Sequence, residues 1–509
     1  MIATAPHPQL LLGDEAAIEE THISWVFLTG DRAFKVKKPV VLPFLDYGTP
    51  ARRLAMCRDE VELNRGLAPD VYLGVRSLLP AGDGRLELGA EDDPDAVDYA
   101  VEMRRYPAEA TLAARLAAGT AGRAELAAVG ERLARYHAKA VRCITADGAE
   151  AVKRWLDDDF ASLRSLLRDP SERRALARAE RFAAAFLTRT WDELDGRGAG
   201  GMVRDCHGDL RLEHVLLEHD VEVVDCVEFN AGLRQIDVAA DLAFLVMELH
   251  EACRPDLAAI LVRAYRKAGG YPGSDALLAF FAAYRAQVRA KVALTRGSQL
   301  ALGDAADETV HATALLRLGE RLQWAARTPL IVVVAGVAAS GKTTLARALA
   351  DESGFAHLNS DVIRKRGAGL APTERAPAAV YSAEANRATY AALGRRAAET
   401  ANAGVVVDAT FRNRADRDAF RSRLPADTPL LVVECRAPAD VLLARARVRA
   451  SQANGVSDAG PAVVRDQLRR SDPLDEVDAR DHVLLRADQP VGQLVAAIAD
   501  GLDRRLIDR

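Results

Sequence analysis

The sequence predicts an α+β region with a strand-rich lobe and a helical lobe, followed by an α/β region with a parallel sheet. Three observations lead to this fold class. Two strand-like runs, at 24–28 and 33–37, flank the turn Thr29-Gly30-Asp31, which predicts a β-hairpin. From about 107 to 325, apolar residues recur at three- and four-residue spacing, as in amphipathic helices. Beyond Thr328-Pro329, apolar strands and helices alternate, which indicates a parallel sheet.

Composition narrows the class of protein. The chain has 509 residues, 49% of them hydrophobic, so it can form several domains with cores of their own. Lys plus Arg number 68 and Asp plus Glu number 73, a net charge of -5 that does not favour a dedicated nucleic-acid binder. The six cysteines show no CxxC spacing, and we see neither a signal-like leader nor a membrane-length apolar run. We therefore expect a cytoplasmic protein that does not enter a membrane; its oligomeric state is left open.

We divide the chain into three predicted domains, residues 1–106, 107–325 and 326–509. In the first, a helix is expected from about 50 to 67 and a further strand at 98–103. In the last, we predict strands at 330–335, 356–359, 404–408 and 429–434.

A glycine-rich segment, residues 336–344, is the strongest motif. It fits GxxxxGK[ST] and lies between a predicted buried strand and a predicted helix, where backbone N–H groups and the helix N-terminus can hold phosphate. Lys342 is expected to contact the β- and γ-phosphates of ATP, and the Thr343 hydroxyl to bind Mg²⁺. The ATP-binding residues predicted in this segment are Gly336, Ser340, Gly341, Lys342, Thr343 and Thr344.

Polar residues at later strand ends complete this predicted site. Asp361 follows the second strand and can accept a proton from a substrate hydroxyl, while Arg364 can hold substrate or phosphate. Asp408 ends a buried strand, which is typical of a Walker-B carboxylate and makes it a metal-ligand candidate. Arg445 and Arg449 precede a glycine-containing loop and are predicted to contact ATP from a lid.

The run from 332 through 364, with Asp408 later, resembles the P-loop kinases of the gluconate kinase, zeta-toxin and polynucleotide kinase group. The resemblance implies that Asp361 is the base and Arg364 a substrate-side residue, both catalytic together with Lys342. Such kinases phosphorylate small molecules or nucleic-acid ends. A polynucleotide 5′-hydroxyl kinase, with an auxiliary N-terminal region, would require a basic groove beside Asp361, edged by Arg364, Lys365 and Arg366.

A second pair of aspartates lies in the middle of the chain. Asp209 and Asp225 are 16 residues apart, and we expect them on two short strands joined by a tight loop, where they can converge. Phosphoryl transfer needs such a pair, one carboxylate to orient the acceptor hydroxyl and one to hold the metal.

Residues 20–300 resemble the aminoglycoside phosphotransferase family, which has a protein-kinase-like bilobal fold. His207, Asp209 and His214 match its HxDxxxxN motif, with histidine in the asparagine position, and Asp225 matches its metal-binding aspartate. The resemblance implies that Asp209 is catalytic and that Asp225 and His214 are metal ligands. It also implies that Lys35, Glu60 and Met103 form the ATP site, with Met103 in the hinge between the lobes, and that ATP and Mg²⁺ are cofactors. The predicted fold class is thus a protein-kinase-like domain followed by a P-loop NTPase domain.

Two departures from the family pattern leave alternatives open. His214 offers an imidazole where Mg²⁺ prefers oxygen, and no GxGxxG loop precedes Lys35. We predict a two-module ATP-dependent phosphotransferase acting on small-molecule hydroxyl acceptors. The alternatives are the polynucleotide kinase, with a nucleic-acid 5′ end as partner, and a regulatory ATP-binding protein with a pseudokinase module. A further alternative is resistance to cationic aminoglycosides, with an acidic pocket formed by Glu228, Asp237 and Glu248.

Overall fold

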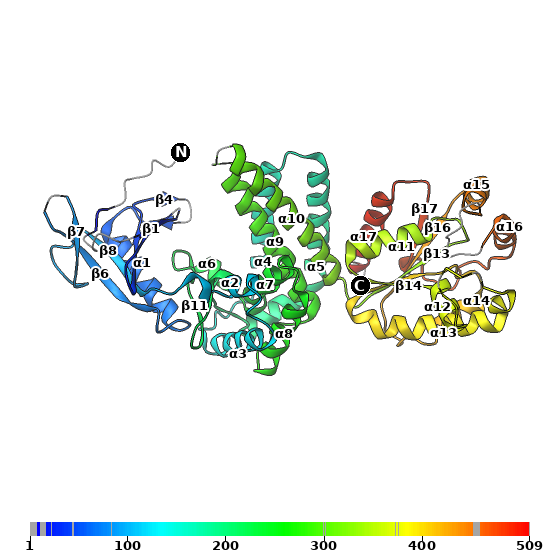
Figure 1. Ribbon diagram of the computed structural model, residues 1–509, viewed down its shortest axis with the longest axis horizontal. Helices are drawn as coiled ribbons and strands as arrows, with labels where there is room; N and C mark the ends of the chain where they lie inside the picture. The colour runs from blue at the N-terminus through cyan, green and yellow to red at the C-terminus, as the bar shows by residue number, and fades with distance from the viewer. Residues whose placement is uncertain are drawn as a thin grey trace. The chain divides into compact units, whose positions relative to one another are not determined.

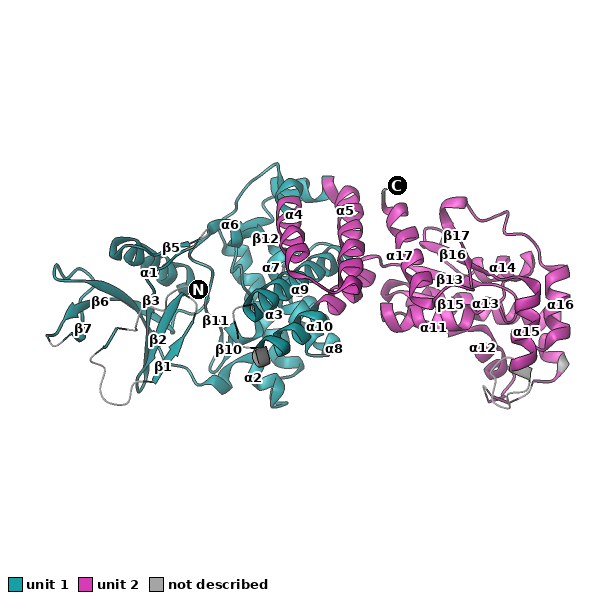
Figure 2. Cartoon of the chain, turned by 90° about the horizontal axis from the view of Figure 1, so that it is seen from above, with its two compact units in different colours: residues 1–152, 192–315 teal, residues 153–191, 316–509 magenta. Residues whose placement is uncertain are grey.

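The computed structural model describes residues 8–10, 17–21, 23–42, 45–82, 84–298, 300, 302–371, 373–374, 376–450 and 459–507. The chain forms two compact units (Figure 2). One comprises residues 1–152 and 192–315, and the other comprises residues 153–191 and 316–509. The predicted helical range therefore contributes to both units, and the division at 106 and 325 stays a prediction.

The strand-rich lobe contains a six-stranded antiparallel sheet in the order β1-β2-β3-β8-β6-β7 (Figure 1). The predicted hairpin is present, with Phe27 opposite Phe34 and the Gly-Asp turn between the strands. The helix α1 (Pro50–Arg65) begins at Thr49, whose side chain accepts a hydrogen bond from the backbone of Arg52. The strands are β1 (Ala17–Glu20), β2 (Ser24–Leu28), β3 (Arg32–Lys37), β6 (Tyr72–Pro80), β7 (Leu86–Gly89) and β8 (Asp98–Arg104), besides the short pair β4 (Val41–Leu42) and β5 (Leu45–Asp46).

The following segment is mainly helical and contains small antiparallel pairs. The strand β10 (Val215–Leu217) pairs with β11 (Val221–Val223), and β9 (Val203–Asp205) pairs with β12 (Gln235–Asp237). A short 3₁₀ helix, η2 (Leu212–His214), precedes β10. The α-helices are α2 (Leu112–Ala117), α3 (Arg123–Lys139), α4 (Gly148–Leu166), α5 (Pro170–Ala199), α6 (Ala231–Arg234), α7 (Val238–Glu251), α8 (Pro255–Lys267), α9 (Asp275–Gly297) and α10 (Leu302–Ala326).

The C-terminal region contains a five-stranded sheet in the order β14-β15-β13-β16-β17, and every neighbouring pair is parallel. All five residues of β13 are buried, as expected for a central strand covered on both faces. The strands are β13 (Ile331–Ala335), β14 (Ala356–Asn359), β15 (Val405–Asp408), β16 (Leu430–Arg436) and β17 (His482–Arg486). The four strands predicted here are therefore confirmed to within one or two residues at each end.

Helices cover both faces of this sheet (Figure 1). Alternate β13 side chains separate two cores: Val332 and Val334 pack with α11 and α17, whereas Ile331 and Val333 pack with α13 and α14. The helices are α11 (Lys342–Ser353), α12 (Ser360–Gly367), α13 (Ala383–Thr400), α14 (Arg414–Arg421), α15 (Ala439–Ala450), α16 (Pro461–Arg470) and α17 (Val491–Ile507). This order places the carboxyl ends of β13, β14 and β15 side by side, where an α/β sheet binds its ligands.

The helical hairpin at 153–191 packs within the second unit. Arg327 forms a bidentate ion pair with Asp503, at 2.8 and 2.9 Å, and its guanidinium lies 4.3 Å from the centre of the Phe182 ring. These contacts attach α5 to the end of α10 and to α17. Within the described part of the chain, no helix is both long and apolar enough to cross a membrane.

Candidate active sites

The phosphate loop connects β13 to α11. Gly336 has φ +150, and a Cβ at this position would lie 2.7 Å from both the Cys435 carbonyl oxygen and Ser340 Oγ. Only glycine tolerates that conformation and that close approach. Ala339 and Gly341 also have positive φ, at +66 and +90. The loop therefore has a tightly curved backbone, and Lys342, Thr343 and Thr344 are the first residues of the helix that follows it.

Two buried oxygens in this region lack hydrogen-bond partners among the described residues: Ser340 Oγ and Asp408 Oδ1. Unpaired buried acceptors are rare and suit a bound ligand or ion. Burial raises the pKa of the Asp408 carboxyl, but His357, Lys342, Thr343 and other neighbours lower it overall. An ionised carboxylate beside a hydroxyl and a lysine fits Mg²⁺ with nucleotide phosphates, so Thr343 and Asp408 remain the residues that would hold the metal.

Asn359 connects two strand ends in a way that sequence reasoning did not identify. It lies opposite Asp408 in the β14–β15 register, and its Nδ2 donates to Asp408 Oδ2 at 2.6 Å. Its Oδ1 also caps α12 by accepting hydrogen bonds from the backbone of Asp361 and Val362. An asparagine directly before a helix is a common N-cap, so the cap of α12 has a local signal in the sequence. The contact between Asn359 and Asp408 instead depends on the register of β14 and β15.

Asp361 and Arg364 form an ion pair one helical turn apart at the start of α12. Arg364 also donates to Asn386 Oδ1 at 3.2 Å, and its guanidinium lies 5.0 Å from the centre of the Tyr381 ring. Arg364 is buried and Lys365 is fully buried, whereas Arg366 is exposed. The polynucleotide kinase alternative requires these three residues to edge a basic groove. The structure contradicts that requirement, because two of the three side chains are buried.

The predicted lid arginines lie on α15. Arg445 donates to the Ala487 carbonyl oxygen at 3.0 Å, and its Nη1 would lie 3.9 Å from a Cβ at Gly341, so it sits beside the phosphate loop. The side chain of Arg449 lies outside the described residues. The α16 residue Gln467, which was not predicted, accepts a hydrogen bond from the Ala338 backbone N–H at 2.7 Å.

The second site is organised around Lys35 in β3. Its Nζ lies 2.8 Å from Glu60 Oε1 on α1 and 2.7 Å from Asp225 Oδ1. Burial lowers the pKa of Lys35, but Asp225 and Glu60 outweigh it, so the pKa lies well above its ordinary value. Burial raises the pKa of the Asp225 carboxyl, but Lys35 and His214 outweigh this effect, so the pKa lies below its ordinary value. The structure thus brings together a fixed cation and two carboxylates from three distant segments.

His214 lies between the two aspartates. Its Nδ1 is 2.8 Å from the Asp209 backbone oxygen and 3.9 Å from Asp209 Oδ2, and its Nε2 is 3.7 Å from Asp225 Oδ2. The convergence of Asp209 and Asp225 is therefore present. Their expected placement on strands is wrong, because both lie in irregular segments that flank the β10–β11 pair. Asp225 has φ +64, which a regular strand does not contain.

Asp241 braces the loop that carries Asp209. Its carboxylate accepts hydrogen bonds from the backbone N–H groups of His207 and Gly208, at 3.2 and 2.8 Å, and contacts His137 Nε2 at 3.0 Å. His207 is fully buried, and its Nε2 contacts the Val224 carbonyl oxygen at 2.8 Å. Both residues therefore stabilise the conformation of this loop.

A buried ion-pair cluster next to Lys35 was not expected. Lys37 is fully buried, lies 2.7 Å from Glu60 Oε2, and also pairs with Glu228. The Tyr47 hydroxyl donates to Glu228 Oε1 at 2.6 Å. Alternation along β3 predicts that Lys35 and Lys37 share a face of the sheet. It does not predict that buried carboxylates from distant segments neutralise their charges.

This cluster also overturns the expected acidic pocket. Glu228 is neutralised by Lys37, Asp237 is held by a bidentate pair with Arg197, and Glu248 is bound to Arg211. Because all three carboxylates are buried and paired, they do not form an open surface for a cationic ligand.

Met103 lies in β8 opposite Ala33, in the same core as Tyr72 and Val101. Tyr72 contributes a further contact that sequence reasoning missed, since its hydroxyl accepts a hydrogen bond from the Asp225 backbone N–H at 3.0 Å. The predicted hinge residue is thus the penultimate residue of a strand, and the chain leaves the sheet after Arg104.

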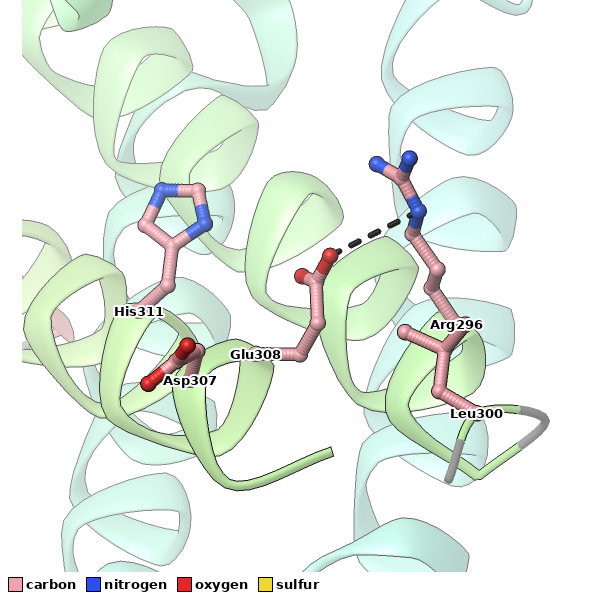
Figure 3. A pocket seen from close by; sticks show the side chains of 5 residues that line it. All are labelled: Arg296, Leu300, Asp307, Glu308 and His311. Carbon is pink, nitrogen blue, oxygen red and sulfur yellow. Dashed lines mark ion pairs between the residues drawn. The ribbon is translucent and has the colours of Figure 1, made fainter. Parts of the chain in front are cut away.

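A separate surface pocket is lined by Arg296 on α9, by Leu300 after that helix, and by Asp307, Glu308 and His311 on α10 (Figure 3). Arg296 pairs with Glu308 at 3.5 Å, and His311 pairs with Glu251 at 2.7 Å. None of the lining residues belongs to either predicted site, and ion pairs already satisfy much of the charge.

Comparison with known proteins identifies two kinase-type modules. Residues 85–277 match the phosphotransferase enzyme family, and residues 331–474 match the family described as AAA domain. The uncharacterized protein Rv2004c of Mycobacterium tuberculosis is 34% identical over 454 residues, 87% of each chain. A cytidylate kinase of Rhodopseudomonas palustris is 28% identical over 187 residues, 35% of this chain and 87% of that protein. A solved choline/ethanolamine kinase family protein from Mesorhizobium loti is similar to 60% of this chain and 89% of its own, with 14% identity and a TM-score of 0.35.

The fold and the two family matches define a kinase enzyme with a phosphotransferase domain and a P-loop kinase domain. The chain belongs to the same family as the mycobacterial protein Rv2004c.

Proposed function

We propose that this kinase transfers the γ-phosphate of ATP to hydroxyl groups of small molecules at two separate sites. In the N-terminal module, Lys35 binds ATP phosphates, Asp209 accepts the proton of the acceptor hydroxyl, and Asp225 holds the metal that accompanies ATP. In the C-terminal module, the phosphate loop and Lys342 bind ATP, and Asp361 accepts the acceptor proton. Mg²⁺ supplies charge neutralisation at the phosphates when it is bound.

The observation that carries this proposal is the arrangement around Lys35. A lysine paired with Glu60 at 2.8 Å and with Asp225 at 2.7 Å, close to a second aspartate, supports nucleotide binding by the N-terminal module. A regulatory module would have no need of Asp209 beside this set. The arrangement therefore favours catalysis over a pseudokinase role.

Small acceptors are favoured over polynucleotide ends at the C-terminal site. Lys365 is fully buried and Arg364 pairs with Asp361, so neither is exposed to a nucleic-acid backbone. Likeness to cytidylate kinases adds nucleoside monophosphates to the screen as a contrasting class, because their acceptor group is a phosphate instead of a hydroxyl. A cytoplasmic location is supported by the cysteines, all of which are free thiols in the structure.

The test is transfer of ³²P from [γ-³²P]ATP to a panel of sugars, amino alcohols, aminoglycosides, nucleoside monophosphates and 5′-hydroxyl oligonucleotides. Wild type, Asp209→Asn and Lys342→Ala are assayed in parallel. We expect one labelled product to disappear in Asp209→Asn alone and another in Lys342→Ala alone. Labelling of oligonucleotides only, or phosphate release without any labelled acceptor, would contradict the proposal.

A further inference from the structure

The backbone of Asp225 has a conformation that needs support from its surroundings. Its φ is +64, in the left-handed region that residues with a Cβ disfavour. The direction of a side chain follows from the conformation of its backbone, so this φ helps to set where the carboxylate points. In the structure it points to Lys35, with Oδ1 at 2.7 Å from Nζ. Contacts with other segments must therefore hold the peptide in place.

Two side chains from the strand-rich lobe hold successive backbone N–H groups at this point. The Tyr72 hydroxyl accepts a hydrogen bond from the Asp225 N–H at 3.0 Å, and Asn64 Oδ1 accepts one from the Cys226 N–H at 3.0 Å. Tyr72 is 2% exposed and Asn64 is fully buried, so water does not replace either acceptor. A buried N–H without an acceptor is costly. These two bonds therefore favour the observed conformation over others that turn the N–H groups away.

The amide of Asn64 is itself fixed by a second hydrogen bond. Its Nδ2 donates to the Glu60 carbonyl oxygen at 2.8 Å. A flipped amide would set donor against donor and acceptor against acceptor, so only the observed orientation satisfies both contacts. Asn64 follows Glu60 by four residues, which places both on one face of α1. Because Glu60 pairs with Lys35 directly, at 2.8 Å, α1 supports both carboxylates that contact this lysine.

We propose that Asn64 and Tyr72 are positioning residues of the N-terminal site, which hold the peptide at 225–226 so that the Asp225 carboxylate stays beside Lys35. This inference rests on the proposed function, because Lys35 and Asp225 are the residues assigned there to ATP phosphates and metal. Both positioning residues act through Asp225. The lysine and its two carboxylates are thus assembled before a nucleotide binds.

The test is the rate at which sulfo-N-hydroxysuccinimidyl acetate acetylates Lys35 in the full chain without nucleotide, measured by mass spectrometry. An ammonium paired with two carboxylates stays protonated and reacts slowly. We expect Tyr72→Phe and Asn64→Leu each to raise the rate about tenfold, because an adjacent opposite charge suppresses the free amine by at least about that factor. Tyr99→Phe removes the hydroxyl of a partly buried tyrosine in the same core and should leave the rate unchanged.

Two references separate positioning from a general loss of structure. Asp225→Asn should itself accelerate the acetylation of Lys35, and Tyr72→Phe added to it should change the rate by less than about twofold, because the effect passes through the carboxylate. Lys37 pairs with Glu60 and Glu228, so its own rate should stay constant. Equal acceleration with and without Asp225→Asn, or parallel acceleration of Lys37, would overturn the inference.

The absence of acceleration in Tyr72→Phe, or in folded Asn64→Leu, would also overturn it. Tyr72→Phe removes one oxygen atom and keeps the ring in the core, so the result does not depend on whether Asn64→Leu folds. MgATP tests the proposed function separately, since it should protect Lys35 of the wild type from acetylation. Without that protection the proposed function fails at this site, while the rates measured without nucleotide still decide the positioning. With protection but contradictory rates, only the positioning fails.

Discussion

Lys37 provides the sharpest test of the structural reasoning. It is fully buried and shared between Glu60 and Glu228, so Lys37→Met leaves two buried carboxylates with fewer partners. Removing one partner of a buried ion pair costs about 3–5 kcal/mol. Since 1.4 kcal/mol is a factor of ten, local opening near β3 and α1 should become about 100- to 4000-fold more populated.

Hydrogen exchange measured by mass spectrometry on the full chain reports this opening in peptides that cover β3 and α1. Arg58→Met is the matched control, because Arg58 lies on the same helix and forms an exposed pair with Glu91 that is expected to contribute under about 1 kcal/mol. Adding Glu228→Gln to Lys37→Met should recover part of the protection, since it removes one unpaired charge. Equal exchange in Lys37→Met and Arg58→Met would show that the buried ion pairs of Lys37 do not stabilise β3 and α1.

Three further predictions concern the phosphate loop, the contact between Asn359 and Asp408, and the carboxylate of Asp241. Gly336→Ala should abolish nucleotide-dependent protection of the phosphate loop from hydrogen exchange, because its Cβ would clash with Cys435 and Ser340. Gly354→Ala, at φ +74 with open space around it, should lower the free energy of unfolding by about 1 kcal/mol and leave that protection unchanged. Equal loss of protection in both variants would contradict this prediction. Asn359→Asp keeps the cap of α12 but places a second carboxylate beside Asp408, so it should lower the melting temperature more than Asn359→Ala does at pH 7, and the reverse order would disprove the contact. Burial raises the pKa of Asp241, but His137, His207 and Gly208 lower it overall, so its contribution to stability is complete above the unfolded pKa of about 3.9 and is lost as pH falls through the lower folded value. The penalty of Asp241→Asn, measured by exchange at 207–210, should therefore be equal at pH 7 and pH 5 and shrink only below about pH 4; a penalty that shrinks already at pH 5 would contradict the low pKa.

The elements that the sequence predicts well are those whose signals are local. Strand β14 was predicted at its observed bounds, and the phosphate loop follows directly from its motif between a buried strand and a helix. The hairpin of β2 and β3 follows from alternation and a Gly-Asp turn. In each case a short window of residues contains the physical cause of the structure.

The features that the sequence did not predict depend on distant partners. The burial of Lys37 was not predicted, because its pairing with Glu228, 191 residues away, has no local signal in the sequence. The contact of Asn359 with Asp408 requires the register of two parallel strands. The strand placement of Asp209 and Asp225 failed because Asp241 and Lys35, from outside the segment, hold those loops in irregular conformations.

The central claim is that one chain contains two independent nucleotide sites. Equilibrium dialysis of labelled ATP against wild type, Lys35→Met, Lys342→Met and the double variant tests this claim directly. We expect two bound nucleotides per chain in wild type, one in each single variant and none in the double variant. A single bound nucleotide in wild type that disappears with Lys342→Met alone would contradict it.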